Sequence, residues 1–355
     1  MSEPLRTPLR TVLIGCGRIC RKHLEVIAAL PELRLVGVCD QVAERAERAA
    51  ASAGVRPYLD FREMAAAERP DVAVILTESG SHARIGLELV RSVGTLIVEK
   101  PLALTLESTD ALIEACEQHR TRLFVVKQNR YNPPVVRLRA ALEAGRFGKL
   151  AMGTVRVRWC RTQAYYDQDA WRGTWRDDGG VFANQASHHI DLLHWMMGPV
   201  ESVQAYTATR LVDIETEDTG VAVLRFTSGA LGVIEATTAT RPIDLEGSLS
   251  LLGEKGTVVL GGFAVNRVET WQFAEPLPED ADVAASSTAP PDVYGYGHYS
   301  FYRDVLDCIR TGRRAMLDGL AGRRALELIT ALYEAAATGH EVRLHYKPRA
   351  VRLGR

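Results

Sequence analysis

Short apolar runs alternate with helical patterns over the first 127 residues of the chain. In stretches such as residues 42–53 and 106–119, apolar residues recur every three or four positions with charged residues between them, which is typical of amphipathic helices. Strands that alternate with helices indicate a parallel sheet covered on both faces. The predicted strands cover residues 11–14, 33–38, 55–58, 72–76, 95–98 and 123–126.

The pattern changes after about residue 130. A helix over residues 135–144 precedes a series of alternating strands separated by turn residues, which predicts a mostly antiparallel sheet. A helix over residues 180–197 interrupts the series and ends at Gly198 and Pro199. The predicted strands here include residues 151–159, 200–209, 221–226, 230–236 and 248–252.

Two domains follow from this change of pattern, and a length of 355 residues suits two cores. We expect α/β plus α+β architecture. The first domain, residues 1–127, has a Rossmann doubly wound parallel sheet, and the second, residues 128–355, has a mostly antiparallel open sheet. Residues 276–297 predict a loop rich in Pro, Ala, Ser and Asp. Helices over residues 299–310 and 320–337 close the chain and are candidates to pack back on the first domain.

The composition of the chain argues against several classes of function. Lys and Arg number 43 against 44 Asp and Glu, so no overall field draws the chain to nucleic acid or to a membrane surface. The six cysteines are scattered without a C-x-x-C pair, which indicates neither a disulfide framework nor a zinc ribbon. We find no secretory signal and no apolar run of spanning length, and we therefore expect a cytoplasmic protein.

A glycine-rich turn joins the first predicted strand to the following helical stretch. In Gly15-x-Gly17-x-x-Cys20, Gly15 suits a tight turn, Gly17 lets a backbone approach phosphates, and Cys20 is a small residue where Gly or Ala is usual. The turn predicts a dinucleotide whose pyrophosphate rests on a helix N-terminus.

Asp40 ends the second predicted strand, where the adenosine ribose of a dinucleotide would lie. A carboxylate there favours NAD by repelling the 2′-phosphate of NADP. Two alternatives stay open: Asp40 caps the next helix, or Arg45 and Arg48 admit NADP. Thr77 and Ser79, after the strand that ends at Leu76, either line the dinucleotide or cap a helix.

Glu99, Lys100 and Pro101 follow another apolar run. Proline restricts the residue before it to an extended backbone, so the Lys100 side chain is held in one direction. The chain has only six lysines, and a lysine can polarise a hydroxyl or change its protonation state where arginine cannot. The alternative is a solvated lysine at a strand end.

The helical stretch 184–191 places Asn184, His188 and Asp191 on one face, with His189 turned about 100° away. A histidine with a near-neutral pKa suits removal of a hydroxyl proton as hydride leaves the same carbon. A buried structural histidine and a metal site formed by His188, His189, Asp191 and His194 are the competing interpretations, although no H-E-x-x-H pattern occurs.

In this order, the glycine turn, Asp40, the Glu99-Lys100-Pro101 motif and the Asn184 to His188 helix resemble the glucose-fructose oxidoreductase and inositol dehydrogenase (Gfo/Idh/MocA) family over nearly the whole chain. Within it, the chain is most similar to the branch of UDP-N-acetylglucosaminuronate 3-dehydrogenases of O-antigen and lipopolysaccharide synthesis. That likeness rests on residues 125–133, 165–167, 171–175, 184–188 and 245–248.

The resemblance implies NAD-dependent oxidation of the C3 hydroxyl of UDP-N-acetylglucosaminuronic acid to the 3-keto sugar, in a homotetramer. It implies Lys100 and His188 as catalytic residues, with His188 the favoured base and Lys100 polarising the hydroxyl, and no metal. The implied cofactor contacts are Gly15, Gly17, Arg18, Ile19, Asp40, Thr77, Ser79, His82, Glu99, Lys100, Gln128, Trp171 and Arg172. The implied substrate contacts are Lys100, Asn129, Arg158, Arg161, Gln163, Tyr165, Tyr166, Arg172, Asn184, Gln185 and His188. Some relatives reoxidise bound NADH with 2-oxoglutarate, and the resemblance leaves open whether this chain does.

Two other functions are weighed. A dehydrogenase of a free polyol or sugar acid, like inositol dehydrogenase, would leave the arginines near the site unexplained, because a neutral polyol needs no positive pocket. A catalytically silent scaffold on the same fold would be expected to lose Lys100 or His188, and both are present. Trp171 and Trp175 either stack on a ring or belong to the core.

Overall fold

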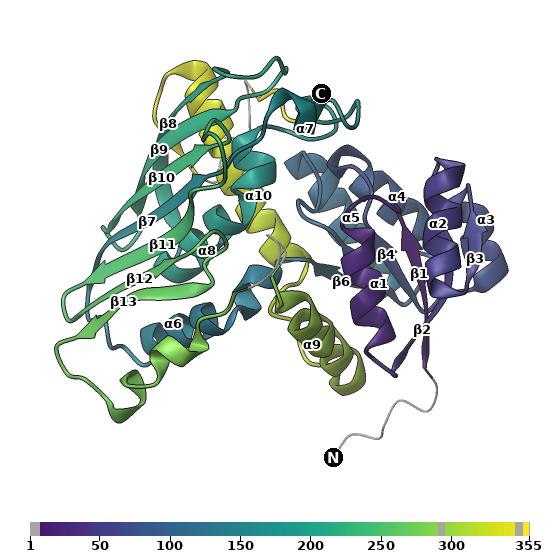
Figure 1. Ribbon diagram of the computed structural model, residues 1–355, viewed down its shortest axis with the longest axis horizontal. Coiled ribbons are helices and arrows are strands. Elements are labelled where there is room, and N and C mark those ends of the chain that lie inside the picture. Colours follow the sequence, from purple (N-terminus) through teal and green to yellow (C-terminus); the bar gives the residue numbers. More distant parts are fainter. Residues whose placement is uncertain (1–7, 290–294, 345–350, 355) are drawn as a thin grey trace. The chain divides into compact units, whose positions relative to one another are not determined.

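The computed structural model describes residues 8–289, 295–344 and 351–354. Contacts divide the chain into two compact units (Figure 1). Unit 1 contains residues 1–127 and 298–324, and unit 2 contains residues 128–297 and 325–355.

Unit 1 is built on a six-stranded sheet in the order β3-β2-β1-β4-β5-β6, with every pair parallel. The central strands are apolar and buried along their length, as parallel strands covered on both faces must be. The expected doubly wound sheet is confirmed. Its strands are β1 (Leu9–Ile14), β2 (Leu33–Cys39), β3 (Arg56–Tyr58), β4 (Val72–Ile75), β5 (Thr95–Val98) and β6 (Arg122–Val125).

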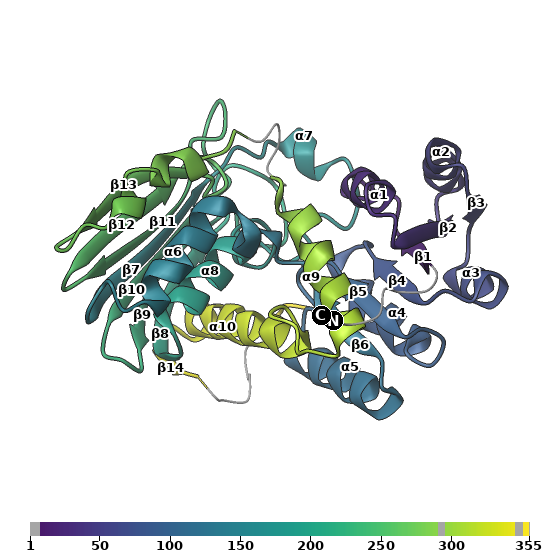
Figure 2. The ribbon, with the colours of Figure 1, turned by 90° about the horizontal axis from the view of Figure 1, so that it is seen from below.

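Helices lie on both faces of this sheet. Figure 2 shows α1 (Cys20–Ala28) and α2 (Ala43–Ala53) on one face, with α4 (His82–Leu89) and α5 (Leu106–His119) on the other. Helix α3 (Phe61–Glu68) packs against β1 and β2. Helix α9 (Gly297–Thr311), far away in sequence, lies beside α1.

The strand order reverses between β1 and β4. Ligands of such sheets bind outside the carboxyl ends of the strands at this reversal. The glycine turn after β1 and Thr77 after β4 therefore stand at the same edge of the sheet.

Unit 2 contains an eight-stranded sheet in the order β13-β12-β11-β7-β10-β9-β8-β14. Only the β7–β10 pair is parallel among its recorded pairs, so the expected mostly antiparallel sheet is confirmed. The strands are β7 (Leu150–Arg158), β8 (Val200–Ala208), β9 (Thr219–Phe226), β10 (Leu231–Thr237), β11 (Glu246–Gly253), β12 (Gly256–Gly261), β13 (Arg267–Phe273) and β14 (Val342–Arg343).

One face of this sheet is covered by helices. Helix α8 (Ser187–Met197) packs on β7 and β11, and α6 (Pro133–Glu143) packs on β12. On β9 every second residue is buried and the others are exposed, because successive side chains of a strand point to opposite faces. The remaining helices are the short α7 (Gln163–Tyr166) and α10 (Gly319–Thr338), whose residues divide between the two units.

The predicted helix over residues 180–197 is wrong in one respect: it consists of a π-helical turn, Val181–Gln185, followed by α8. The N–H groups at the start of the π-helical turn bond to the side chains of Glu217 and Tyr333. The Glu217 carboxylate accepts a hydrogen bond from the backbone N–H of Phe182, and the Tyr333 hydroxyl accepts from those of Gly180 and Ala183. Both acceptors are buried and distant in sequence, and they satisfy N–H groups of the first turn that have no partner within the helix.

Strands β12 and β13 were not predicted. Their pairing shifts register between Val259 and Leu260, so the apolar residues of β13 do not keep a period of two. The loop predicted at residues 276–297 contains two short 3₁₀ turns, Pro278–Asp280 and Val283–Ser286. The Arg146 guanidinium holds the first through two hydrogen bonds to Asp280. Residues 290–294 of that prediction lie outside the described residues.

Among the described residues, no helix combines the length and the apolar composition that a bilayer crossing requires.

Candidate active site

The glycine turn connects β1 to α1 in a shape that only glycine permits. Gly15 has φ +98°, and a Cβ there would lie 2.6 Å from the backbone carbon of Leu76. No atom lies within 4 Å of a Cβ built on Gly17, so the space beside that backbone is open. Cys20 is buried at the first position of α1, where a small side chain is required. These features fit the pyrophosphate site predicted from the sequence.

Asp40 stands directly after β2 and accepts two backbone hydrogen bonds. Its Oδ2 accepts from the N–H of Cys16 in the glycine turn, and its Oδ1 accepts from the N–H of Val42, both at 2.8 Å. The carboxylate therefore braces the turn and precedes α2. Each oxygen keeps a second lone pair, which is what ribose hydroxyls would use.

The segment after β4 is fixed by buried polar side chains. The hydroxyls of Thr77 and Ser81 lie 2.6 Å apart, and Ser79 is buried in the 3₁₀ turn before α4. His82 is buried, with Nδ1 2.8 Å from the carbonyl oxygen of Pro101 and Nε2 3.0 Å from that of Thr77. His82 thereby ties the end of β4 to the end of β5.

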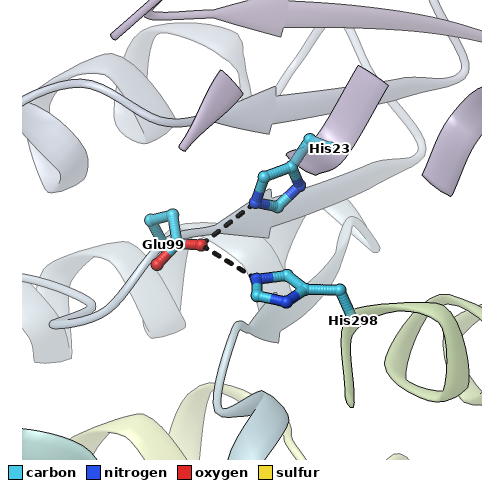
Figure 3. Close-up of side chains that lie close together, drawn as sticks. All are labelled: His23, Glu99 and His298. Carbon is cyan, nitrogen blue, oxygen red and sulfur yellow. Dashed lines mark hydrogen bonds and ion pairs between the residues drawn. The ribbon is translucent and has the colours of Figure 1, made fainter. Parts of the chain in front are cut away.

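Glu99 and Lys100 follow β5 directly. The Lys100 N–H donates to Oε2 of Glu99, and Oε1 of Glu99 faces His23 and His298, which come from α1 and α9 (Figure 3). Burial alone would raise the pKa of Glu99, but the two histidines hold that pKa well below its usual range.

The sequence interpretation named Glu99 as a cofactor contact and did not find its two histidine partners. His298 is about 200 residues away from Glu99 along the chain. No local spacing connects them, and only the return of α9 to unit 1 does.

The π-helical turn of unit 2 presents two of the expected substrate residues. The Asn184 amide donates to Asp178, whose other carboxylate oxygen accepts from the N–H of Gly173. The Gln185 amide donates to the Tyr165 hydroxyl at 3.1 Å. Asn184 lies in the π-helical turn before α8, whereas His188 and Asp191 lie three residues apart within α8, so the three do not belong to one regular α-helix as predicted.

The two adjacent histidines of α8 have different surroundings. His188 is half-buried, and its Nε2 lies 3.4 Å from the amide nitrogen of Gln128. His189 is fully buried against Trp159, and burial lowers its pKa to about 4. A base must reach its substrate, so these surroundings favour His188 over His189.

Asp191 is fully engaged by arginine. The Arg130 guanidinium donates two hydrogen bonds to it, at 2.8 and 2.7 Å, and stacks on the Trp195 ring. This buried pair joins α8 to the short 3₁₀ turn that carries Gln128 and Asn129. Asp191 thus supports the helix, which argues against the alternative of a metal ligand.

Arginine and aromatic side chains gather around Tyr165. Arg172 donates to the Tyr165 hydroxyl at 2.8 Å and to Asp169, and its guanidinium lies over the rings of Tyr165 and Trp171. Arg161 lies over the rings of Trp159 and Tyr165 and donates to the Asp244 carboxylate at 2.9 Å. Two cations, the Tyr165 hydroxyl and the Gln185 amide next to them form a group that can recognise an anionic, hydroxylated ligand.

Three other expected contacts have partners within the protein. Arg158 donates to both Glu235 oxygens at 2.6 and 2.8 Å and to Glu246 at 3.3 Å, so an anionic ligand would have to compete with two carboxylates. Gln163 bonds the backbone of Asp213 and the Asp167 carboxylate. Tyr166 is buried with its hydroxyl 3.1 Å from that of Thr238, and burial raises its pKa to about 12.

Comparison with protein families matches both parts of the chain. Residues 9–127 match the NAD-binding Rossmann fold of the GFO_IDH_MocA oxidoreductase family, and residues 139–344 match the C-terminal alpha/beta domain of the same family.

Two solved structures are similar over nearly the whole chain. The WlbA dehydrogenase from Bordetella pertussis, in complex with NADH and UDP-GlcNAcA, is 43% identical with a TM-score of 0.91, covering 97% of this chain and 100% of that one. The WlbA dehydrogenase from Chromobacterium violaceum, with the same two ligands, is 39% identical with a TM-score of 0.92, covering 98% and 99%. The D-apiose dehydrogenase of Paraburkholderia graminis is 26% identical over 94% of this chain and 88% of its own.

Proposed function

Because the chain belongs to the Gfo/Idh/MocA oxidoreductase family, we propose that it is an NAD-dependent dehydrogenase of UDP-N-acetylglucosaminuronic acid. The reaction converts the C3 hydroxyl of the sugar to a ketone. The observation that carries the proposal is the 43% and 39% identity, at nearly full coverage, to two dehydrogenases that bind NADH and UDP-GlcNAcA. The inositol dehydrogenases are more distant, for example 28% identical over 63% of the chain for the Thermotoga maritima enzyme.

The residues at the edge of the unit 1 sheet fit NAD. The open space beside Gly17 admits a pyrophosphate, and Gly15, Arg18 and Ile19 complete the turn around it. The Asp40 carboxylate would hold the ribose hydroxyls and repel a 2′-phosphate. The other cofactor contacts we propose are Thr77, Ser79, His82, Glu99, Lys100, Gln128, Trp171 and Arg172.

The chemistry needs a base and a polarising group. NAD, when bound, accepts the hydride that leaves C3. His188 takes the hydroxyl proton. Lys100 polarises the reacting hydroxyl, and its backbone is held by Glu99. The C3–H and O–H bonds break, and the C3–O double bond forms.

The group around Tyr165 is our proposed binding site for the acidic nucleotide sugar. Arg161 and Arg172 are the cations for its negative groups, and the amides of Asn184 and Gln185 are donors for its hydroxyls. Asn129 is buried in the 3₁₀ turn before α6. Asn129, Lys100 and His188 are the remaining substrate contacts that we propose. Gln163, Tyr166 and Arg158 remain expected contacts, and the partners of Arg158 make it the weakest of them.

We also propose a cytoplasmic homotetramer in the lipopolysaccharide pathway. The face of the unit 2 sheet opposite α8 exposes Tyr206, Val221, Val223 and Leu231 on three adjacent strands. Arg225 and Glu235 lie on the same face beside these apolar residues, and a mixture of exposed apolar and charged side chains is typical of protein interfaces. The 3-keto product is a substrate for an aminotransferase, and 2-oxoglutarate is the candidate reoxidant of NADH.

The test is NADH formation at 340 nm from purified protein with NAD and UDP-N-acetylglucosaminuronic acid, with and without 2-oxoglutarate. We expect turnover with this sugar and none with myo-inositol. Lys100→Ala should lose orders of magnitude in rate while the protein stays folded. Turnover with myo-inositol alone would replace the proposal with the polyol alternative.

A further inference from the structure

A buried cluster of polar side chains surrounds Glu99, next to Lys100 in unit 1, and the proposed mechanism assigns no role to its histidines or its tyrosine. Glu99 Oε1 lies 3.0 Å from His23 Nε2 and 3.8 Å from His298 Nε2 (Figure 3). The His23 Nδ1 lies 2.7 Å from the Tyr302 hydroxyl, and the two imidazole rings meet edge to face. His23, His298 and Tyr302 are inaccessible to solvent, and Glu99 is nearly so.

The buried position of the Glu99 carboxylate indicates that its hydrogen-bond partners matter for the fold around Lys100. A buried carboxylate is expensive unless every oxygen is hydrogen-bonded or paired with charge. Here Oε1 lies at hydrogen-bond distance, 3.0 Å, from His23, with Nε2 of His298 further away at 3.8 Å, and Oε2 accepts from the backbone N–H of Lys100 at 3.1 Å. Glu99 is therefore the link between the histidines of α1 and α9 and the peptide of Lys100.

The backbone that follows Lys100 is held independently, two peptide bonds further along the chain. The carbonyl oxygen of Pro101 lies 2.8 Å from Nδ1 of His82, which also contacts the carbonyl of Thr77. The backbone on both sides of Lys100 is thus tied to buried side chains. These contacts fix the position and direction of the Lys100 Cα–Cβ bond, from which the side chain that carries the amine starts.

We propose that His23 and His298, acting through Glu99, are positioning residues that set where the Lys100 amine stands. This inference rests on the proposed function, in which Lys100 polarises the reacting hydroxyl. The histidines touch neither reactant. They hold the carboxylate, and the carboxylate holds the peptide of Lys100.

A metal ion held by the same three side chains is the competing explanation, since their ligand atoms all lie within 4.8 Å of one another. The His23 tautomer protonated at Nε2 donates to Glu99 and accepts from Tyr302 at Nδ1, so both of its nitrogens are used without a metal. Burial also lowers the pKa of His298, which suits a neutral ring beside one carboxylate.

The kinetic test compares two substitutions of one histidine. His23→Gln keeps an N–H donor near the position of Nε2, whereas His23→Leu removes it. We expect His23→Leu to lower kcat about 100-fold with little change in the KM for NAD, because displacement of a catalytic group by about 1 Å costs this much. His23→Gln should retain most of the wild-type kcat.

Thr121→Val is the matched control. Thr121 is buried in the same unit at the amino end of β6, and its hydroxyl donates to the carbonyls of Val90 and Val93. Loss of the Thr121 hydroxyl and its two hydrogen bonds should lower the melting temperature of the protein without lowering kcat. Equal kcat losses in Thr121→Val and His23→Leu would overturn the proposal, because a general loss of stability would then explain both.

A double variant tests whether His298 acts through Glu99. If it does, Glu99→Ala and His298→Ala together should have the kcat of Glu99→Ala alone, since groups acting as a unit are not additive. Additive losses would contradict the proposal. Zinc or another metal present at one equivalent in the purified protein and lost in His298→Ala would replace it with a metal site.

A second readout needs no substrate, so it separates this inference from the proposed function. Reductive methylation with ¹³C-formaldehyde labels the six lysines for NMR, and Lys100→Arg identifies the Lys100 signal. We expect this signal to shift in His23→Leu but not in Thr121→Val, with Lys149 and Lys255 unchanged in both. An unmoved Lys100 signal would overturn the inference even if the enzyme is active. A shifted signal in a protein inactive on the UDP-sugar would support the positioning and refute the proposed function.

Discussion

His188 and His189 are neighbours in sequence, yet burial separates their roles. His189 packs against Trp159, and a Cβ added to Gly247 would come within 3.0 Å of its Nε2. No substrate reaches a ring enclosed in this way. His188 keeps part of its ring accessible beside Gln128.

Substitution at the two positions should therefore have different results. We expect His188→Ala to lose about 10²- to 10⁴-fold in kcat, the range typical of a missing general base. His189→Leu should keep most of the activity, and its cost should show in the melting temperature. The kcat values of both variants, measured by steady-state kinetics, show which of the two histidines is the base. An active His188→Ala beside an inactive His189→Leu would move the base by one residue.

Asp40 carries the preference between the two nicotinamide cofactors. Asp40→Asn keeps the shape and an acceptor for the N–H of Cys16 or Val42 but removes the charge. We expect about a tenfold higher KM for NAD and a smaller discrimination against NADP, since one charge-assisted hydrogen bond is worth about 1.5–3 kcal/mol.

The matched control for Asp40→Asn is Asp71→Asn. Asp71 accepts from the N–H of Arg10 at the amino end of β4, away from the edge where the glycine turn lies. Its substitution should leave both KM values unchanged. Measured KM values for NAD and NADP that do not differ between Asp40→Asn and Asp71→Asn would remove Asp40 from the cofactor site.

At the scale of elements, the π-helical turn depends on a buried carboxyl group. Glu217 accepts from the N–H of Phe182 and from the Tyr333 hydroxyl, and its Oε2 has no partner among the described residues. Burial raises the pKa of Glu217 to about 7. A proton is therefore bound more tightly in the folded protein than in the unfolded chain, where the pKa is near 4.5.

The sign of the pH dependence follows. The stability from this proton is complete below the unfolded pKa and is lost as pH rises through about 7. Wild type should lose about 3 kcal/mol from this group between pH 4.5 and 8, and neutral Glu217→Gln should not. Urea unfolding of both proteins at several pH values measures the difference. A constant difference across that range would show that Glu217 does not titrate between those limits.

The elements of unit 1 could be predicted from sequence because each carries its own signal. Strands β4 and β5 are buried on both faces and read as continuous apolar runs, and residues 106–119 form a helix as predicted. The contacts of the turn at residues 181–185 could not be predicted, because their partners, Glu217 and Tyr333, lie far away in sequence.

The same reason limited the prediction of the site. Lys100, Asp40 and His188 stand at recognisable places, after a strand or on a helix. His23 and His298 acquire their role only when α1 and α9 meet at Glu99, and Arg158 meets Glu235 and Glu246 only in the folded sheet. Contacts between residues so far apart in sequence cannot be predicted from residue type and local spacing.

At the scale of the whole molecule, the exposed sheet face of unit 2 is the feature that a monomer would not need. Tyr206 is 69% exposed and pairs with Val221 across two strands, and Val223 is 57% exposed on the same face. Isolated exposed apolar residues are ordinary, but several on neighbouring strands, next to Arg225 and Glu235 of the same face, favour burial against another protein.

Val223→Glu places a charge in the middle of this face and tests the homotetramer. We expect the variant to elute as a smaller species in size-exclusion chromatography with light scattering, because an unpaired charge in a buried interface is strongly unfavourable. Leu59→Glu is the control, since Leu59 is 58% exposed in unit 1 and lies outside the sheet face. It should leave the assembly unchanged. Dissociation in both variants, or in neither, would mean that this face does not join the subunits, and a wild-type monomer would exclude the tetramer itself.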